Sequence, residues 1–240
     1  MEIITYATES RGKFDSLVNN KFGVPVTVLG WGQEWNGFTD KFKGVLKHIE
    51  NKNPDDIIIF LDGFDSEINR DPKEVVDIFK SLDCSVLFSN NVSFFGVLEN
   101  IPFGTCKNNK MANTGMYMGY VKTIRDILMD ALQMNCKDDQ VNINRLCHKY
   151  NEIKVDDNEV LFKNIRTGTS EKTNVYFISF PGEMSVSRYS RAIREYYQFL
   201  YFHISTILLL LMMIFPKTAI VLLILHLSWF VCKADKSCIY

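Results

Sequence analysis

Short apolar runs alternate with longer amphipathic segments along residues 2–182 of this chain. The apolar, β-branched runs predict strands, which we place at Glu2–Ala7, Val24–Leu29, Ile57–Leu61, Ser85–Phe88, Met116–Gly119 and Val175–Phe180. Apolar positions three and four residues apart predict helices at Lys13–Asn20, Thr39–Asn51, Pro72–Leu82, Val121–Leu132 and Val141–Lys149. Because strands and helices alternate, we expect an α/β fold with a mostly parallel sheet flanked by helices.

The C-terminal part of the chain has a different pattern. From Phe199 to Cys232 the sequence is apolar, and Lys217 is its only Lys, Arg, Asp or Glu residue. Roughly 20 apolar residues suffice to cross a bilayer, whereas a buried core helix usually has about 10–14. This segment therefore predicts association with a membrane, as a membrane helix or as a helical hairpin.

Pro216 and Lys217 divide this apolar stretch. One continuous helix over it would rise about 51 Å, against a hydrocarbon core of about 30 Å. Proline removes a backbone donor and lysine is expensive in mid-bilayer, so both suit a turn near a head-group surface. Basic residues on both sides of the stretch suit a hairpin whose two ends stay cytoplasmic. A single span with an interfacial remainder is the alternative.

Composition and charge exclude several classes of protein. A formal net charge of −1 gives no electrostatic basis for nucleic-acid binding. The six cysteines form no CxxC pair, a pattern that argues against a zinc site or a disulfide scaffold and suits a reducing compartment. Residues 1–20 lack the apolar region of a secretory signal. We therefore expect a C-terminally anchored membrane protein whose main domain faces the cytosol.

These patterns divide the chain into four parts. We expect an α/β domain over residues 1–184 and a basic linker helix over 185–198. The membrane-associated segment occupies 199–232, and a short polar tail occupies 233–240. The first part is long enough for one α/β domain with its own core, so we expect it to carry the chemistry.

Two carboxylates follow the most apolar of the predicted strands. Asp62 and Asp65 lie at the end of Ile57–Leu61, and ligands of open α/β sheets bind beyond the carboxyl ends of the strands. Two carboxylates there can hold a hard cation such as Mg²⁺ or Mn²⁺, which in turn binds nucleotide phosphates. The alternative is an ordinary turn at Asp62-Gly63.

Four short motifs follow one another along the predicted strands. They are Ile4-Thr5-Tyr6-Ala7-Thr8, Val28-Leu29-Gly30-Trp31-Gly32-Gln33-Glu34-Trp35-Asn36-Gly37, Phe60-Leu61-Asp62-Gly63-Phe64-Asp65, and the pair Asn113-Thr114-Gly115 and Asp138-Asp139-Gln140. In this order and spacing the chain resembles the glycosyltransferase domain of procollagen lysyl hydroxylases and related collagen glycosyltransferases. The resemblance covers residues 2–182 and implies a GT-A-type fold, in a stand-alone version similar to those that large DNA viruses encode.

The resemblance implies a role for each motif. Asp62 and Asp65 would hold Mn²⁺ or Mg²⁺, which acts as a Lewis acid on the leaving diphosphate. The residues that would contact the UDP-sugar donor are Thr8, Trp35, Phe64, Asn113, Gly115 and Gln140. Asp138 and Asp139 would be catalytic, because an aspartate there can bind sugar hydroxyls or take the acceptor's proton as general base.

Several of these residues also have plain structural interpretations. Trp35 is alternatively a core aromatic, and Asn113-Thr114-Gly115 is alternatively an ordinary polar turn, although the family has its turn close to the sugar. One aspartate of Asp138-Asp139 would cap the following helix while the other faces the cleft. One residue departs from the family: Ser179 stands where a metal-binding histidine is expected, and a hydroxyl is a poor substitute for imidazole.

The favoured function is transfer of a hexose from UDP-glucose or UDP-galactose to an acceptor hydroxyl. The family suggests hydroxylysine in a collagen-like protein as acceptor, and the viral likeness suggests a virion glycan. Ser179 supports an alternative, a catalytically impaired, membrane-tethered binding protein on the same fold. A nucleotidyltransferase would share the carboxylates but leaves the Trp35 segment unexplained.

Overall fold

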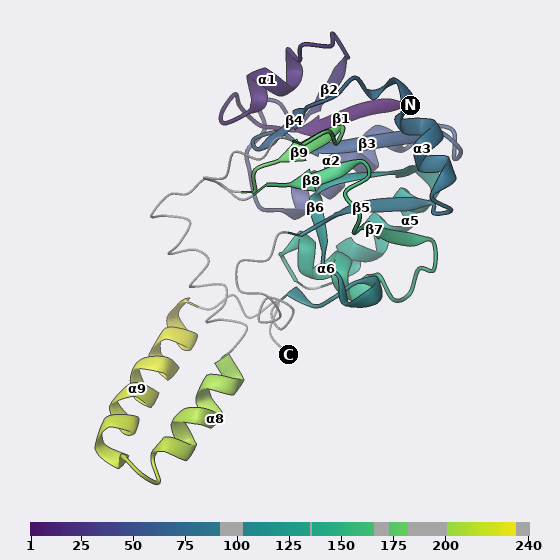
Figure 1. The fold of residues 1–240 in the computed structure, drawn as a ribbon. Coiled ribbons are helices and arrows are strands. Elements are labelled where there is room, and N and C mark those ends of the chain that lie inside the picture. Colours follow the sequence, from purple (N-terminus) through teal and green to yellow (C-terminus); the bar gives the residue numbers. More distant parts are fainter. Residues whose placement is uncertain (92–102, 135, 166–172, 182–200, 234–240) are drawn as a thin grey trace.

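Figure 1 shows an α/β domain and, apart from it, a pair of C-terminal helices. The computed structural model describes residues 1–91, 103–134, 136–165, 173–181 and 201–233, with the backbone alone described at 201–203 and 230–233. Its strands are β1 (Glu2–Tyr6), β2 (Val26–Leu29), β3 (Ile57–Asp62), β4 (Ser66–Ile68), β5 (Val86–Asn90), β6 (Ala112–Tyr120), β7 (Ile153–Asp156), β8 (Phe162–Asn164) and β9 (Phe177–Ser179). Its helices are α1 (Phe14–Val18), α2 (Thr39–Ile49), η1 (Pro72–Glu74), α3 (Val75–Ser81), η3 (Lys107–Asn109), α5 (Val121–Gln133), α6 (Asp139–Leu146), α8 (Tyr201–Leu211) and α9 (Pro216–Lys233).

A six-stranded sheet forms the centre of the domain, in the order β2-β1-β3-β6-β5-β7. Within it β1 pairs in parallel with β2 and β3, and β5 pairs in parallel with β7. Strand β6 lies between β3 and β5 and is antiparallel to both. A second sheet has the order β4-β9-β8. The expectation of an α/β fold with a mostly parallel sheet is therefore confirmed.

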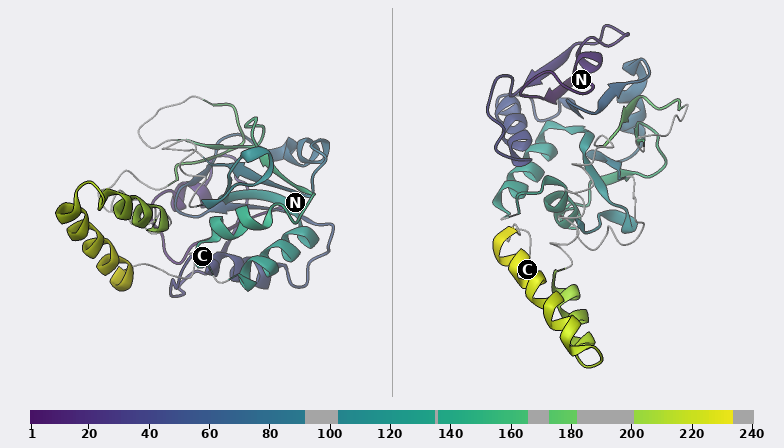
Figure 2. Two further views of the ribbon diagram at one scale, coloured as in Figure 1. Left: turned by 90° about the horizontal axis from the view of Figure 1, so that it is seen from below. Right: turned by 90° about the vertical axis from the view of Figure 1, so that its left-hand side faces the viewer.

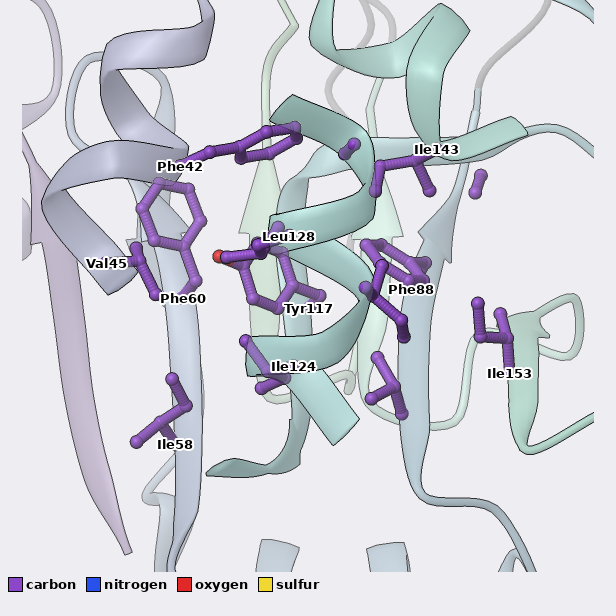
Figure 3. Packing of buried hydrophobic residues seen from close by; sticks show 14 of the residues in the cluster. Phe42, Val45, Ile58, Phe60, Phe88, Tyr117, Ile124, Leu128, Ile143 and Ile153 are labelled. Carbon is purple, nitrogen blue, oxygen red and sulfur yellow. The ribbon is translucent and has the colours of Figure 1, made fainter. Parts of the chain in front are cut away.

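Helices α2, α5 and α6 cover one face of the central sheet (Figures 1 and 2). Ile58 and Phe60 of β3 belong to the core on this side, together with Phe42, Tyr117 and Leu128 (Figure 3). The rings of Phe60 and Tyr117 stack with 5.0 Å between their centroids. This core fixes the helices on the sheet, so the positions at which α2 and α6 begin are fixed as well.

The opposite face of the sheet packs against α1, α3 and the small sheet. Ile57, Ile59 and Leu61, the alternate residues of β3, belong to this second core together with Phe79 and Phe177. Strand β3 is therefore buried on both faces, which explains its uninterrupted apolar run. Because both cores hold β3, the residue at its end emerges at a fixed place on the edge of the sheet.

Three short strands and the start of β6 differ most from the predictions. The sequence pattern does not predict β4, β7 and β8, because three or four residues are too few to show alternation. The expected turn at Asn113-Thr114-Gly115 is wrong, since these residues lie inside β6. The pairing of β5 with β6 shifts in register between Phe88 and Ser89, and such a bulge redirects side chains near a functional edge.

A disulfide joins Cys106 and Cys147, whose Cα atoms are 5.1 Å apart. It contradicts the expectation of a fold without disulfides. The spacing of the cysteines does not reveal the pair, because the separation of 41 residues closes only when the end of α6 packs beside η3. Disulfides persist in oxidising compartments, which is at odds with the expected reducing surroundings. The thiol of Cys84 is free, and burial raises its pKa to about 11.

Helices α8 and α9 form a hairpin (Figures 1 and 2). They are joined by a hydrogen bond of 2.8 Å between Ser205 Oγ and His226 Nε2. Among the described residues, none of the helices combines the length and the apolar character needed to span a bilayer. The predicted linker helix over 185–198 lies outside the described residues, as does the tail from residue 234 onward.

Candidate active site

The carboxyl ends of β1, β2 and β3 lie at one edge of the central sheet because these strands are parallel. The antiparallel strand β6 begins at this edge. In its pairing with β3, Met116 is opposite Leu61, which sets Gly115 beside Asp62. A Cβ built on Gly115 would lie 3.7 Å from the Cβ of Asp62. The topology thus brings the Asn113-Thr114-Gly115 motif to the strand-end carboxylate.

The turn after β3 is pressed against the end of β1. A Cβ on Gly63 would lie 2.9 Å from the Cβ of Ala7 and 2.9 Å from the carbonyl oxygen of Tyr6. Distances this short exclude any side chain larger than hydrogen, so glycine is required by close approach. The Asp-Gly pair is therefore more than a turn signal: it lets the segment that carries Asp62 and Asp65 dock on β1.

The two candidate metal ligands have defined partners in the structure. Asp62 Oδ1 accepts the backbone N–H of Phe64 at 3.1 Å. Asp65 Oδ1 accepts the hydroxyl of Ser179 at 2.9 Å. Ser179 reaches this place because β9 pairs with β4, the strand that follows the motif. The residue that departs from the family pattern therefore contacts one of the two carboxylates.

Lys41, at the start of α2, is a central residue of the site that the motifs do not indicate. Its ammonium lies 2.7 Å from Asp139 Oδ2 and 3.6 Å from Asp62 Oδ2, and the residue is only 7% exposed. Burial by itself lowers the pKa of Lys41, but the charges of Asp139 and Asp62 outweigh burial and raise the pKa above its ordinary value. The lysine is therefore a fixed positive charge that links the end of β3 to the start of α6.

A signal for Lys41 exists in the helical pattern of α2. The buried residues of this helix are Lys41, Phe42, Val45 and Ile49, spaced as the apolar face of an amphipathic helix is. A lysine in phase with such a face is unusual, because a buried ammonium needs partners of opposite charge. A search for apolar periodicity alone therefore misses Lys41, whereas a search for charged residues at buried positions of the helix would find it.

The acidic pair at the start of α6 divides into two positions. Asp138 caps the helix, since its Oδ1 accepts the backbone N–H of Val141 at 3.0 Å. Asp139 is buried, and its Oδ2 accepts the ammonium of Lys41 and, at 2.8 Å, the hydroxyl of Thr114. The expected capping role is confirmed for Asp138, whereas Asp139 faces a buried charged cluster that it forms with Lys41 and Asp62.

Asn113 and Gln140 connect β6 to α6. The amide of Asn113 donates to Gln140 Oε1 at 3.3 Å, and its Oδ1 accepts the backbone N–H of Gly115 at 2.8 Å. A Cβ on Gly115 would lie 2.9 Å from that Oδ1, so the Asn113 side chain folds over a position that needs glycine. Asn113, Gly115 and Gln140, three of the residues expected to contact the donor, are therefore joined by hydrogen bonds.

Trp35 packs at the end of β1 but is not a core residue. Its ring lies 6.0 Å from the ring of Tyr6 and 5.8 Å from the ring of Phe38, and the residue is 41% exposed. The carbonyl of Thr8 accepts the backbone N–H of Gly32 at 3.0 Å. The loop that carries Trp35 is therefore tied to the end of β1 and presents an aromatic surface to solvent.

Phe64 lies under a cation. The guanidinium of Arg11 is 4.0 Å from the centroid of the Phe64 ring, and the backbone N–H of Lys13 donates to the Phe64 carbonyl at 2.8 Å. Gly12 permits this approach, because a Cβ there would lie 2.2 Å from the same carbonyl oxygen. Arg11 is a further neighbour of the site that the motifs do not indicate. Phe64 and Trp35 contact different neighbours, so the structure does not join these two aromatics.

A cavity of about 580 Å³ lies between β2 and α2, with Tyr6, Gly30, Asp40, Lys43, Gly44 and His48 among its lining residues. The ring of Tyr6 fits between Gly30 and Gly44, where a Cβ would lie 2.4 Å and 2.7 Å from ring atoms. The described lining includes neither Asp62 nor Asp65. The strand edge, where the charged groups converge, is therefore the candidate active site, and the cavity is its neighbour.

The carboxylate oxygens at the strand edge can hold a hard divalent cation only if a bound ligand completes its coordination shell. Asp62 and Asp65 offer carboxylate oxygens, which suit Mn²⁺ and Mg²⁺. Within the described ranges, no group of three or more His, Cys, Asp or Glu side chains is arranged to hold a metal ion. Two carboxylates are nevertheless the usual protein share when substrate phosphates and water complete the shell. The residues present therefore fit a cation that binds together with a diphosphate.

The sequence matches one family and several curated proteins. Residues 1–188 match the PLOD GT domain family. A procollagen-lysine,2-oxoglutarate 5-dioxygenase from Drosophila melanogaster is 24% identical over 161 residues, which cover 61% of this chain and 22% of that protein. The multifunctional procollagen lysine hydroxylase and glycosyltransferase LH3 from Homo sapiens is 30% identical over 161 residues, covering 60% of this chain and 21% of LH3. The match thus spans about a fifth of each relative.

Two solved structures of glycosyltransferases have a course of the chain similar to that of this protein. The galactosyltransferase LgtC in complex with donor and acceptor sugar analogs has a TM-score of 0.49 at 13% identity, covering 80% of this chain and 94% of that chain. A glycosyltransferase involved in the glycosylation of the major capsid of PBCV-1 has a TM-score of 0.44 at 11% identity, covering 79% and 97%. Both similarities are too weak to assign a function.

The family match decides the relationship. It extends over most of the chain and includes every motif on which the resemblance rests. The matched residues also build the strand edge at which Asp62, Lys41 and Asp139 meet. The chain belongs to the PLOD GT domain family.

Proposed function

We propose that this chain is a metal-dependent glycosyltransferase that moves a hexose from UDP-glucose or UDP-galactose to an acceptor hydroxyl. The observation that carries the proposal is the convergence of Asp62 and Asp139 on Lys41 at the carboxyl edge of the sheet, with Asp65 in the same turn. Membership of the PLOD GT domain family supports this type of reaction. A nucleotide-sugar diphosphate is the kind of ligand that such an edge accommodates.

Asp62 and Asp65 would hold Mn²⁺ or Mg²⁺ together with the donor's diphosphate. When bound, the cation would supply Lewis-acid stabilisation of the charge on the leaving group. The chain's own part is to orient the two carboxylates, through the Phe64 N–H on Asp62 and the Ser179 hydroxyl on Asp65. Orientation of this kind reduces the reorganisation needed when the ligand binds.

Aromatic and amide side chains would bind the rest of the donor. Trp35 has an exposed face, and stacking of a base on an aromatic ring is worth about 1–3 kcal/mol. Phe64 would offer a second ring, without the hydroxyl of a tyrosine. Asn113 and Gln140, which already share a hydrogen bond, carry the donors and acceptors that sugar hydroxyls need.

Asp139 is the carboxylate that we assign to the sugar and the acceptor. In the transfer, the bond between the sugar's C1 and the phosphate oxygen breaks, and a bond from C1 to the acceptor oxygen forms. The acceptor's proton passes to a carboxylate acting as general base. Lys41 and Thr114 orient Asp139 for this role. Asp138 stands next to it as the cap of α6, so its loss would act through the position of the helix.

The acceptor that we propose is the hydroxyl of hydroxylysine in a collagen-like chain, or a glycan. The name of LH3 joins procollagen lysine hydroxylase and glycosyltransferase in one protein. The present chain matches one region of such relatives, 21% of LH3. We therefore propose the transfer step alone for it.

A second candidate function rests on Ser179. The hydroxyl contacts Asp65 where an imidazole would be a far stronger ligand for Mn²⁺. On this reading the chain binds UDP-sugars weakly or without turnover and acts as a binding protein. The intact Asp62, Asp65 and Asp139 support the enzyme over this alternative.

Two measurements on the full chain test the proposal. Calorimetry should show UDP binding in Mn²⁺ that is lost in EDTA and in Asp62→Ala/Asp65→Ala. Release of UDP from UDP-glucose or UDP-galactose should be detected for the wild type and lost in Asp139→Asn, which should still bind UDP. Absence of UDP binding by the wild type would refute both functions. Binding without turnover on any donor would favour the binding protein.

A further inference from the structure

We propose that the α8–α9 hairpin inserts tip first into a lipid bilayer, with both of its ends on the side of the α/β domain. Figures 1 and 2 show the hairpin standing apart from that domain. Its outer surface is formed by large apolar side chains: Ile207, Leu209, Leu210, Leu211, Met213, Ile214, Phe215, Ile220, Val221, Leu222, Ile224, Leu225 and Leu227 are all exposed. Water-soluble proteins rarely expose a continuous apolar surface of this kind.

The exposed residues surround both helices rather than forming one stripe. Leu209, Leu210 and Leu211 are consecutive and all exposed, and consecutive residues of a helix point in directions about 100° apart. Ile220, Val221 and Leu222 repeat this on α9. A second copy or a protein groove would cover one face and leave the others in water. Lipid chains cover every direction, so the occupant is a bilayer.

One polar pair of the hairpin is turned inward, whereas Thr206, Thr218 and Ser228 are exposed. His226 is 2% exposed, and its Nε2 shares a hydrogen bond of 2.8 Å with Ser205 Oγ on the facing helix. A bilayer core contains no water to satisfy polar side chains, so polar groups there are best paired between helices. With most of its large apolar groups outside and a polar pair inside, the hairpin differs from a water-soluble helix pair.

The turn of the hairpin carries its most exposed apolar residues and a lysine. Met213 is 85% exposed, and Ile214 and Phe215 follow it. Helix α8 rises about 17 Å and α9 about 27 Å, against a hydrocarbon core of about 30 Å. Lys217 lies beside this tip, and its long aliphatic stem lets the ammonium extend toward the far head groups. Deep insertion therefore needs neither helix to cross the bilayer.

Flotation of the full-length chain with phosphatidylcholine vesicles tests the insertion. The chain is made by cell-free synthesis in the presence of the vesicles. Wild type should float in low and in high salt, because apolar insertion is not screened. Leu209→Asp/Leu225→Asp should remain largely at the bottom of the gradient. Met129→Asp is the matched control, since Met129 is an exposed apolar residue of α5 (50%), and this variant should float.

Three outcomes would overturn the proposal. The first is flotation of Leu209→Asp/Leu225→Asp to the level of the wild type. The second is a wild-type chain that does not float and forms a discrete dimer cross-linked through α8 and α9, which would assign the surface to a second copy. The third comes from protease protection of vesicle-bound chains with an epitope tag at each end. Equal accessibility of both tags supports the hairpin, and protection of one tag alone refutes it.

Discussion

The strand edge and the α8–α9 hairpin both bury polar side chains, but they arrange apolar groups in opposite ways. At the strand edge, Lys41 and Asp139 form a buried ion pair while apolar residues fill the cores on both faces of the sheet. In the hairpin, Ser205 and His226 form a polar pair inside and most of the large apolar residues lie outside. In both regions these buried polar pairs satisfy one another, and the two regions differ in where their apolar side chains lie. The distribution in the hairpin is the one that the proposed insertion into a bilayer requires.

The largest effect is expected from removing the cation at the strand edge. Lys41→Met keeps most of the side-chain volume but leaves Asp139 buried without its ammonium, which should lower the free energy of unfolding by about 3–5 kcal/mol. Urea unfolding of the full chain followed by tryptophan fluorescence measures it. Lys43→Met is the matched control on the same helix, because the Lys43 side chain is 62% exposed and surface pairs contribute about 0–1 kcal/mol. Equal losses in the two variants would contradict a structural role for the buried pair.

The ion pair of Lys41 and Asp139 also predicts how the free energy of unfolding depends on pH. Since the folded-state pKa of Lys41 is raised above the ordinary value of 10.5, its contribution to stability is fully present below about that pH. The contribution is lost only as the pH rises through the higher folded pKa. The stability gap between wild type and Lys41→Met should thus persist from about pH 7 to 9 and narrow above about pH 10.5. A gap that closes near neutral pH would show that Lys41 loses its proton there.

The disulfide should give the next largest effect. Cys147→Ser removes a cross-link between residues 41 apart, and native disulfides typically contribute about 2–4 kcal/mol. Thermal unfolding should show a lower midpoint for Cys147→Ser, and reducing agent should lower the wild type's midpoint by at least as much, because Cys136 is also disulfide-bonded. Cys84→Ser is the control, because its thiol is free. If reducing agent leaves the wild-type midpoint unchanged, the cross-link contributes nothing to the domain's stability.

Restoring an imidazole beside Asp65 should have a smaller effect. In Ser179→His the new ring would add a nitrogen ligand near the two carboxylates, so Mn²⁺ should bind about tenfold more tightly, a difference of about 1.4 kcal/mol. Calorimetry with Mn²⁺ in the presence of UDP measures it, and Ser179→Ala is the control for loss of the hydroxyl. Unchanged Mn²⁺ affinity in Ser179→His would mean that this position does not face the metal.

The smallest effect is expected inside the hairpin. Ser205→Ala removes one hydrogen bond between α8 and α9, and such bonds between membrane helices average about 0.6 kcal/mol. Unfolding of the hairpin by denaturing detergent, in micelles, should therefore shift only slightly. Leu210→Ala is the comparison, since Leu210 faces outward and its loss removes no contact between the helices. A loss of stability as large as that expected for Lys41→Met would imply that this hydrogen bond is the main interaction between α8 and α9.

The long elements can be predicted from the sequence because their patterns are local. Helix α2 and strand β3 are predicted to within a few residues, since their periodicity is repeated over their whole length. Strands of three or four residues repeat nothing, so β4 and β8 become visible only when β9 pairs with them. Short strands depend on their partners, and the partners are far away in sequence.

The site can be predicted only in part, for a related reason. A strand end or a helix start fixes the place of Asp62 and Asp139, and the sequence indicates both. The meeting of Asp139 with Lys41, and of Asp65 with Ser179, depends on how separate elements pack. The pairing of Cys106 with Cys147 depends on packing in the same way. Motifs identify the residues, and the fold decides which of them touch.

The position of Lys41 relative to Asp62 and Asp139 depends on how the Tyr6 ring fits between Gly30 and Gly44. Gly44 lies about one turn after Lys41 on α2, and a methyl group there would overlap the Tyr6 ring. Relief of that overlap moves the helix away from β1 and carries the ammonium away from its two carboxylates. The geometry of the charged cluster therefore depends on the space left by an uncharged glycine about one helical turn away.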